Sequence, residues 1–154
     1  TLAARLVTRF GRELTDRPAS RGLTHLFPRP VDLADADVAA IGLPAERAGA
    51  IRALAREVAR SRLDLGPATS LEEAERRLAA IPGVGPWTAS AIALRSLGEP
   101  DAFPAGDLAL RKALAGSAGL PSAAAAEARA RAWRPWRAYA LLHLWTDLAQ
   151  REDR

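Results

Sequence analysis

The most informative short segment is the turn from Ile81 to Thr88, which reads Ile-Pro-Gly-Val-Gly-Pro-Trp-Thr. Gly83 and Gly85 can adopt positive φ angles and let the backbone lie flush against another surface. Pro86 suits the first turn of a following helix, where several amides lack helical partners, those of Trp87, Thr88 and Ala89. Small residues and free amides at the positive end of a helix can bind an anion. An isolated Gly-x-Gly is more often an ordinary helical hairpin, so the turn alone leaves both interpretations open.

A second candidate group is the carboxylate of Asp107, which follows the segment Phe103-Pro-Ala-Gly106 and starts a predicted helix. Aspartate is among the best helix N-caps, so an isolated Asp107 would be given a structural role. At a helix N-terminus, however, the dipole favours the ionised form, and a fixed negative charge can stabilise a developing cation. Its place downstream of the glycine turn and the following helix favours the chemical role.

An aromatic block from Trp133 to Trp145 holds three of the four tryptophans and the single tyrosine. A helix from Pro135 would carry Leu141, Trp145 and Leu148 on one face and Trp136, Tyr139, Ala140 and His143 on another. Most of the block is expected to be core, including Trp133 and Trp136. His143 lies in an apolar run and is interpreted as a hydrogen-bonded structural histidine rather than a catalyst.

Helices must position these groups, and apolar spacing and capping residues predict where they lie. The stripe Leu2, Leu6, Phe10 and Leu14 opens the chain, and Ser70-Leu-Glu-Glu73 forms a capping box. The predicted helices cover about 2–14, 35–41, 44–62, 70–80, 86–97, 107–115, 121–131 and 135–150. Residues 15–34 are expected to be an irregular connection, and Gly66-Pro67 a break. Without any alternating strand pattern or internal repeat, the sequence predicts an all-α fold.

Composition bounds the function. The 154 residues allow one domain or one lobe of a larger enzyme, and 49% hydrophobic but only 5% aromatic residues favour helix-on-helix packing. The net charge of +4 comes almost wholly from arginine, since Lys112 is the only lysine. Guanidinium groups suit phosphate, although an alanine and arginine excess is equally consistent with genome composition. The lack of cysteine excludes disulfides, thiolate zinc sites and iron–sulfur clusters in these residues, and no apolar stretch predicts a membrane span.

The pattern apolar–Pro–Gly–apolar–Gly between two helices resembles the helix–hairpin–helix motif, which holds the phosphates of one DNA strand through backbone amides. Three segments together resemble the helix–hairpin–helix DNA glycosylases, and within them the 3-methyladenine DNA glycosylase II branch of alkylation repair. They are LAAIPGVGPWTA at 78–89, FPAGDL at 103–108 and WRPWRAYALLHLW at 133–145. The resemblance is close over about 71–146 and looser over 35–62. It implies a helical, helix–hairpin–helix glycosylase-like domain.

The resemblance also implies roles by position. Asp107 would be the catalytic carboxylate, Trp145 the wall against which an extruded base stacks, and Trp87 a neighbour in the same cleft. Leu108 stands where some relatives have an aromatic residue, so stacking in the base-binding pocket is expected to differ. The phosphate-binding amides would be those of Gly83, Gly85 and Thr88. No cofactor is implied beyond a structural Na⁺ or K⁺ on the backbone carbonyls of Ala79, Ile81 and Val84.

One carboxylate is enough for the implied chemistry. Most glycosidases need a second one to protonate the leaving group, but an N3- or N7-alkylated purine already carries positive charge. The base must leave the stack, and an indole then attracts it by cation–π contact. A bifunctional enzyme would need a lysine for a Schiff base, which relatives of that kind carry at the position of Trp87. The sequence therefore predicts a monofunctional N-glycosylase for 3-methyladenine and 7-methylguanine in base-excision repair.

Two other interpretations stay open: a non-catalytic helix–hairpin–helix DNA-binding module, and an all-α interaction domain with a coincidental hairpin. Asp107 together with Trp145 favours the enzyme, because a phosphate-binding module needs neither. The start at Thr1 reads like the middle of a helix, so residues 1–154 are expected to be one domain of a larger protein, without the amino-terminal lobe and the duplex wedge. The implied partner is double-stranded DNA with alkylated bases, with no membrane contact, for a monomer associated with the nucleoid in the bacterial cytoplasm.

Overall fold

The computed structural model describes residues 1–15, 22–63, 70–117 and 119–152, and within them the fold is all-α, as predicted. The expected break at Gly66-Pro67 and part of the expected irregular connection lie outside the described residues. The β-pairing recorded in the described ranges consists of two isolated bridges, Glu13 with His25 and Gly116 with Gly119. Contacts divide the chain into two compact units, Thr1–Asp64 with Ile81–Gly83, and Leu65–Ala80 with Val84–Arg154.

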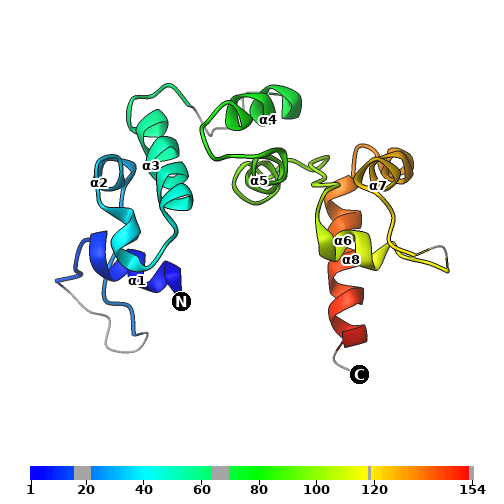
Figure 1. Cartoon of the computed structure of the whole chain (residues 1–154), viewed down its shortest axis with the longest axis horizontal. Helices are drawn as coiled ribbons and strands as arrows, with labels where there is room; N and C mark the ends of the chain where they lie inside the picture. The colour runs from blue at the N-terminus through cyan, green and yellow to red at the C-terminus, as the bar shows by residue number, and fades with distance from the viewer. Residues whose placement is uncertain (16–21, 64–69, 118, 153–154) are drawn as a thin grey trace. The chain divides into compact units, whose positions relative to one another are not determined.

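The first unit contains α1 (Leu2–Phe10), α2 (Pro30–Leu33), the 3-10 turn η1 (Val38–Ile41) and α3 (Ala45–Ala59), which succeed one another in Figure 1. α2 packs on α3, and both α1 and α3 contact η1. The core of this unit consists of the buried residues Leu6, Leu33, Val38, Ile41, Ala48 and Ala55. Alanines fill a large part of it, which agrees with the close helix packing expected from the composition.

The first helix is shorter than predicted. Its N-cap is Thr1, whose hydroxyl accepts a hydrogen bond from the Ala4 amide. α1 ends at Phe10, and its C-cap is Gly11, where a Cβ would clash with the carbonyl oxygens of Leu26 and Val7. The backbone is extended there, and Leu14 leaves the helical stripe to bond Thr24 instead, by a 2.9 Å hydrogen bond from its amide.

The long third helix also ends early. Pro44, expected as the first helical residue, is the N-cap instead, and α3 covers Ala45–Ala59 rather than continuing to about Arg62. Ser61 adopts a left-handed conformation with φ 54°, which no α-helix can contain. Leu63 is nevertheless buried, so the apolar pattern identified a core residue that lies beyond the helix.

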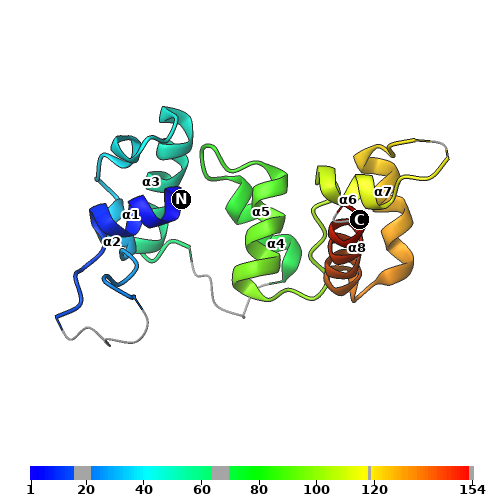
Figure 2. The ribbon, with the colours of Figure 1, turned by 90° about the horizontal axis from the view of Figure 1, so that it is seen from below.

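The second unit contains the paired helices α4 (Leu71–Ala79) and α5 (Pro86–Ile92), the π-helical turn η2 (Ala93–Leu97), α6 (Leu108–Ala113), α7 (Ala123–Ala130), the 3-10 turn η3 (Arg131–Trp133) and α8 (Arg137–Glu152). α4 packs against α5, and α6 lies alongside α8 (Figure 2). A core of Phe103, Leu110, Leu114, Ala126, Ala130 and Leu141 holds α6, α7 and α8 together.

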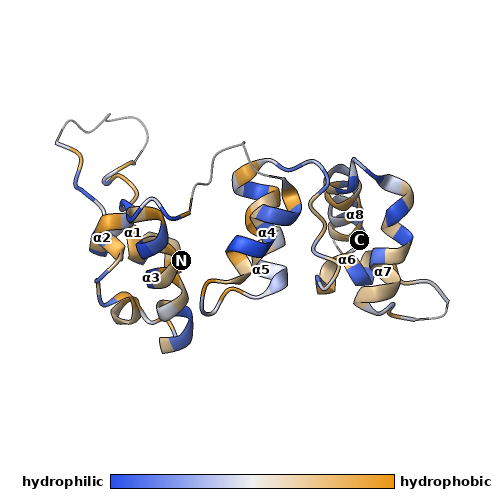
Figure 3. Ribbon diagram, turned by 90° about the horizontal axis from the view of Figure 1, so that it is seen from above, coloured by the Kyte–Doolittle hydropathy of each residue, from blue (hydrophilic) through white to orange (hydrophobic). Residues whose placement is uncertain are grey.

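α4 shows how local sequence sets a boundary. The Ser70 hydroxyl caps it by accepting from the Glu73 amide, as the capping box predicts. The Glu73 carboxylate, however, does not return to the Ser70 backbone, because it accepts hydrogen bonds from Arg76 and Arg77. These two arginines, Arg76 first, hold the pKa of Glu73 below its ordinary value. Hydrophilic and hydrophobic residues alternate along α4 in Figure 3, because its buried side faces α5.

The aromatic block only partly joins the core. Trp133 packs edge-on against Phe103, with ring centroids 6.1 Å apart, so its predicted core position is confirmed. Trp136 is 58% exposed and stacks edge-on with Tyr139, so its assignment to the core is wrong. His143 is exposed on α8 and does not line the pocket that contains Asp107, and among the described residues no hydrogen bond of its ring is recorded, so the expectation of a hydrogen-bonded structural histidine is wrong. α8 begins at Arg137 rather than Pro135, which places Trp136 before the helix.

Candidate active site

Asp107 is the N-cap of α6, as its position predicts. Its Oδ1 accepts a 2.8 Å hydrogen bond from the Leu110 amide, and its carbonyl accepts one from Arg111. This cap fixes the carboxylate at the start of α6, with its side chain only partly buried. The structural role of Asp107 therefore exists, but it uses only one of several acceptor positions on the two carboxylate oxygens.

Two tryptophans occupy further positions on the same carboxylate. Trp145 on α8 donates its indole Nε1–H to Oδ1 at 3.0 Å, and Trp87 on α5 donates its Nε1–H to Oδ2 at 3.0 Å. The partners lie 38 and 20 residues from Asp107 in the sequence. The fold of the second unit thus brings together the three side chains that the motifs singled out for chemistry and base binding.

These groups line a pocket of about 380 Å³ in the second unit. Its walls are Trp87, Ala91, Arg95, Pro104, Asp107, Ala109, Trp145, Leu148 and Ala149. The side chain of Trp87 is half exposed, whereas Trp145 is partly buried and packs against the core of this unit. The pocket is mostly apolar, and its aspartate is held by neutral N–H donors, so the negative charge of the carboxylate faces the pocket unneutralised.

Arg95 is a pocket residue that sequence reasoning missed. It lies in the π-helical turn η2, and its guanidinium carbon is 5.5 Å from the centroid of the Trp145 ring. The only sequence feature that could have indicated its role was a single charge in the otherwise uncharged run Ala-Leu-Arg-Ser-Leu at 93–97. A regular helix through these residues, as the sequence predicts, would not have indicated where its side chain points.

A buried ion pair supports the loop that leads to Asp107. Arg137, only 5% exposed at the start of α8, donates to both oxygens of Asp101 at 2.7 and 2.8 Å and to Glu127 at 2.7 Å. Burial lowers the pKa of Arg137, but the hydrogen bond and charge of Asp101, with Glu127 and Glu75, outweigh it and hold that pKa above its ordinary value. Sequence reasoning missed this pair, although Arg137 lies inside the aromatic block and Asp101 lies two residues before the Phe103 segment.

The hairpin glycines differ from each other. Gly83 has φ +84°, as predicted, and belongs to the first unit, where a Cβ would come within 2.7 Å of the Ala50 Cβ. Gly85 is the N-cap of α5 with φ −83°, so the expectation of a positive φ there is wrong. A Cβ on Gly85 would meet no heavy atom within 4 Å. The chain's own packing therefore requires glycine at position 83 and not at position 85.

The amides after Pro86 are also only partly free. The Ala89 amide donates to the Gly85 carbonyl at 2.9 Å, so the expectation that it lacks a helical partner is wrong. This bond makes Ala89 the first amide paired within α5, which leaves Trp87 and Thr88 as the amides of the first turn without helical acceptors. Thr88 is partly buried, while Gly85 and Pro86 are exposed beside it.

The remaining predicted residues lie away from the pocket walls. Leu108 is 55% exposed at the start of α6 and is not among the residues that line the pocket. Lys112 is exposed on α6 and does not line the pocket either. Ile81 and Val84 are buried and Ala79 is exposed, and a cation on their carbonyls stays a prediction.

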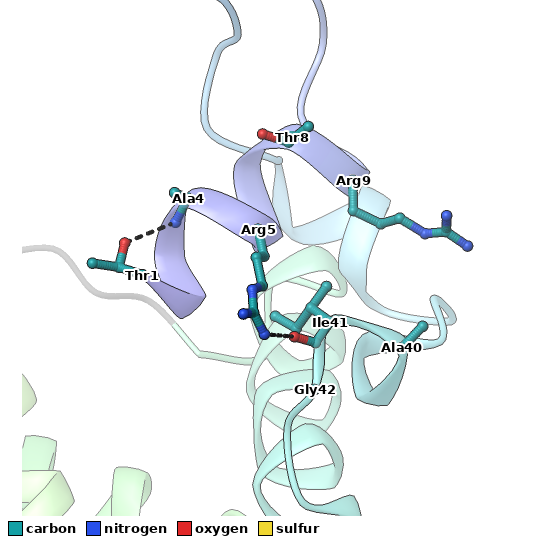
Figure 4. Close-up of a pocket in the computed structure, with 8 residues that line it drawn as sticks. All are labelled: Thr1, Ala4, Arg5, Thr8, Arg9, Ala40, Ile41 and Gly42. Atoms are coloured by element: carbon teal, nitrogen blue, oxygen red, sulfur yellow. Dashed lines mark hydrogen bonds between the residues drawn. The ribbon is translucent and has the colours of Figure 1, made fainter.

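A larger hollow of about 780 Å³ lies in the first unit, between α1 and η1 (Figure 4). Arg5 donates to the Ile41 carbonyl at 3.2 Å across it, and Arg9 points away from that contact. Its other walls are Thr1, Ala4, Thr8, Ala40 and Gly42. It contains no carboxylate and none of the predicted site residues, so the candidate site is the Asp107 pocket.

Among the described residues, no helix has both the length and the apolar composition needed to cross a bilayer.

Comparison with known proteins confirms the resemblance to the helix–hairpin–helix DNA glycosylases. No family model matches the chain. The chain is 46% identical over 149 residues to the probable bifunctional transcriptional activator/DNA repair enzyme AlkA of Mycobacterium tuberculosis, an alignment that covers 96% of this chain and 29% of that protein. It is 35% identical over 149 residues to DNA-3-methyladenine glycosylase 2 of Escherichia coli, covering 94% of this chain and 49% of the relative.

The fold agrees with a solved relative. The 3-methyladenine DNA-glycosylase from Archaeoglobus fulgidus superposes with a TM-score of 0.79 at 29% sequence identity, over 96% of this chain and 51% of that one. The chain therefore spans about half the length, or less, of these three proteins.

Proposed function

We propose that the protein is a monofunctional DNA N-glycosylase that releases alkylated purines by hydrolysis. The observation that carries the proposal is the Asp107 carboxylate, held by the indole N–H groups of Trp145 and Trp87 at the wall of an apolar pocket. The names of the similar proteins, which include DNA-3-methyladenine glycosylase 2, support the same activity.

The carboxylate supplies a fixed negative charge. When the bond between the sugar C1′ and the alkylated purine breaks, its electron pair neutralises the cationic base, and positive charge develops on the sugar. Asp107 stabilises that charge without having to reorient, because three N–H donors already hold it. Oδ1 accepts two of these bonds and Oδ2 accepts one, so Oδ2 keeps a lone pair for the incoming water. Water adds to C1′ and releases a proton to solvent.

The two indoles give a physical basis for selecting alkylated bases. A purine bearing a positive charge is attracted to an indole face by on the order of 0.5–2 kcal/mol more than a neutral one. Hydrogen bonds from both indoles to an anion polarise the rings and favour the same contact. The volume of about 380 Å³ lies within the range of small-molecule sites and is large enough for one purine.

The hairpin would bind DNA phosphates through backbone amides, and this contact would not depend on the base sequence. Gly85 is exposed, with open space where a Cβ would stand, so a phosphate can approach the amides of Trp87 and Thr88 closely. Carbonyl oxygens suit a hard cation, which supports a Na⁺ or K⁺ on Ala79, Ile81 and Val84 as part of this proposal. Duplex affinity measured at equal ionic strength in sodium, potassium and tetramethylammonium chloride tests the cation, since only the first two would fit.

The decisive experiment is Asp107→Asn, assayed by release of 3-methyladenine and 7-methylguanine from methylated duplex DNA. Asn is also a good helix cap, so the free energy of unfolding should change little. Loss of the charge should lower excision of 7-methylguanine by on the order of 10²–10³-fold while DNA binding persists. The Asn variant should release 3-methyladenine at a higher residual rate than 7-methylguanine, because 3-methyladenine leaves the sugar more easily.

Excision of both bases at wild-type rates by the Asn variant would reduce Asp107 to a cap. Wild-type protein that binds duplex DNA but releases neither base would favour the non-catalytic DNA-binding module instead.

A further inference from the structure

Arg95 lies in the Asp107 pocket without an anionic partner. Its guanidinium stacks on the Trp145 ring, and both residues line the pocket. Within the part of the chain that the structure describes, no carboxylate forms an ion pair with Arg95. Several other arginines of the same unit form ion pairs, among them Arg134 and Arg137 with Asp101, and Arg151 with Asp147. Arg95 is thus a charged group available to a ligand.

Asp107, the one carboxylate that lines the pocket, does not neutralise the charge of Arg95. Asp107 receives its hydrogen bonds from Leu110, Trp145 and Trp87, and none from Arg95. The same pocket therefore presents an anion and a cation that are not joined to each other. Such a pair of separate charges suits a ligand that carries both signs, with its positive part at Asp107 and its negative part at Arg95.

The backbone around Arg95 is irregular in a way that places this side chain. α5 ends at Ile92 and continues as the π-helical turn Ala93–Leu97, which Gly98 terminates with φ +70°. A π-turn adds a residue to a helical turn and shifts the side chains beyond it, and such turns are frequent at functional sites. Here the shift accompanies an exposed arginine directed at an aromatic wall, rather than a further apolar contact.

We propose that Arg95 binds a phosphodiester of the nucleotide whose base has entered the pocket. This inference rests on the proposed function. In such a nucleotide the alkylated base and the developing sugar cation face Asp107, and the phosphate joined to the same sugar is the negative group. Guanidinium is well suited to it, because it can donate two parallel hydrogen bonds to phosphate oxygens. The contact forms only once the nucleotide has left the duplex, unlike the hairpin contact.

Arg95→Gln tests the proposal by gel-shift titration of two duplexes of one sequence. One duplex carries a tetrahydrofuran abasic analogue, whose sugar leaves the helix without unpairing a base, and the other is undamaged. Affinity for the abasic duplex should fall on the order of tenfold, and its salt slope by about one. Affinity for the undamaged duplex should not change. Arg131→Gln, which removes an exposed charge outside the pocket, should leave both affinities unchanged.

Arg95→Lys provides a second variant, because it keeps the positive charge and loses the bidentate geometry. Its loss of affinity for the abasic duplex should be a few-fold, between wild type and Arg95→Gln. Thermal unfolding of both variants shows whether loss of the Trp145 contact disturbs the fold. If Arg95→Gln is unstable, the comparison of Arg95→Lys with wild type still decides the matter, since equal affinities would overturn the proposal.

Three results would overturn the assignment of Arg95. Unchanged binding of the abasic duplex would show no contact, and equal losses on both duplexes would place Arg95 in the general DNA contact. Faster excision of 7-methylguanine with unchanged affinity would mean that the guanidinium merely competes with the cationic base for the Trp145 ring. Wild-type protein without preference for the abasic duplex would overturn the proposed function itself, and this inference with it.

Discussion

Arg137 and Asp101 are joined by two parallel hydrogen bonds of 2.7 and 2.8 Å. They lie 36 residues apart and connect the start of α8, the helix of Trp145, to the loop that leads to Asp107. The guanidinium also lies 6.0 Å from the Phe103 ring centroid. One buried side chain therefore fixes the two elements that supply the carboxylate and the wall of the pocket.

Arg137→Leu should consequently lower the free energy of unfolding by about 3 kcal/mol, because it removes both short hydrogen bonds from the mostly buried Asp101 carboxylate and leaves it only the 3.6 Å contact with Arg134. Chemical denaturation measures this loss. Arg151→Ala, which breaks the exposed pair with Asp147, is the control and should cost less than about 0.5 kcal/mol. A similar small loss in both variants would show that the Arg137 pair does not support the loop.

The two hairpin glycines should separate folding from DNA binding. Gly83→Ala should destabilise the protein by about 1–3 kcal/mol, because it strains a left-handed backbone and pushes a Cβ against Ala50. Gly85→Ala should cost no more than about 1 kcal/mol, since its backbone is extended and the space is open.

Gly85→Ala should nevertheless weaken binding to damaged and undamaged duplexes by the same factor, because the added methyl group obstructs a backbone contact that reads no sequence. Paired titrations with the two duplexes measure the effect. If Gly85→Ala bound undamaged DNA as tightly as wild type, the hairpin would not be the phosphate-binding element.

Trp87→Phe should distinguish the hydrogen-bonding role of the indole from its role as an aromatic wall. The variant keeps a ring but removes the donor to Asp107 Oδ2, so kcat for excision should fall on the order of tenfold. Stability should change by less than about 1 kcal/mol, because Trp87 is half exposed. Trp87→Ala should in addition raise KM for methylated DNA. Full activity of the Phe variant would leave stacking as the only role of Trp87.

The protein should not cut the DNA strand. Borohydride reduction on a duplex with an abasic site should yield no covalent complex, because Lys112 is the sole lysine and lies exposed on α6, outside the pocket. Denaturing electrophoresis detects such a complex. An adduct that disappears in Lys112→Arg would replace the monofunctional reaction by a lyase.

Local signals predicted the helices well where a capping residue marked an end. Ser70 and Asp107 each cap the helix that the sequence assigned to them, and Pro44 lies within one residue of its predicted place at the start of α3. The errors lie where backbone geometry has no side-chain signal, as at Ser61 with its positive φ and in the π-turn that replaces the end of the helix after Pro86. The position of a capped helix end is set by residues that are neighbours in sequence. The position of a helix end in a strained conformation is set by the tertiary packing of the segment that follows.

The site could be predicted only as a set of residues. Asp107, Trp87 and Trp145 were identified by motif, but their hydrogen bonds span 20 and 38 residues and depend on how α5 and α8 meet α6. The same holds for Arg137 with Asp101, since any of many arginines could pair with a given aspartate in a chain this rich in arginine. Periodicity also could not show that Trp136 lies before α8 and faces solvent.

Because two indoles bond Asp107, the intrinsic tryptophan fluorescence of the protein can report on the pocket. The emission of an indole depends on the partner that its N–H group bonds, and two of the four tryptophans bond the same carboxylate. Trp133 packs against Phe103 and Trp136 against Tyr139, so neither of the other two reports on the pocket in the same way. Ultraviolet emission therefore responds to the arrival of a base at Asp107 in the unlabelled protein, with Asp107→Asn as the reference spectrum.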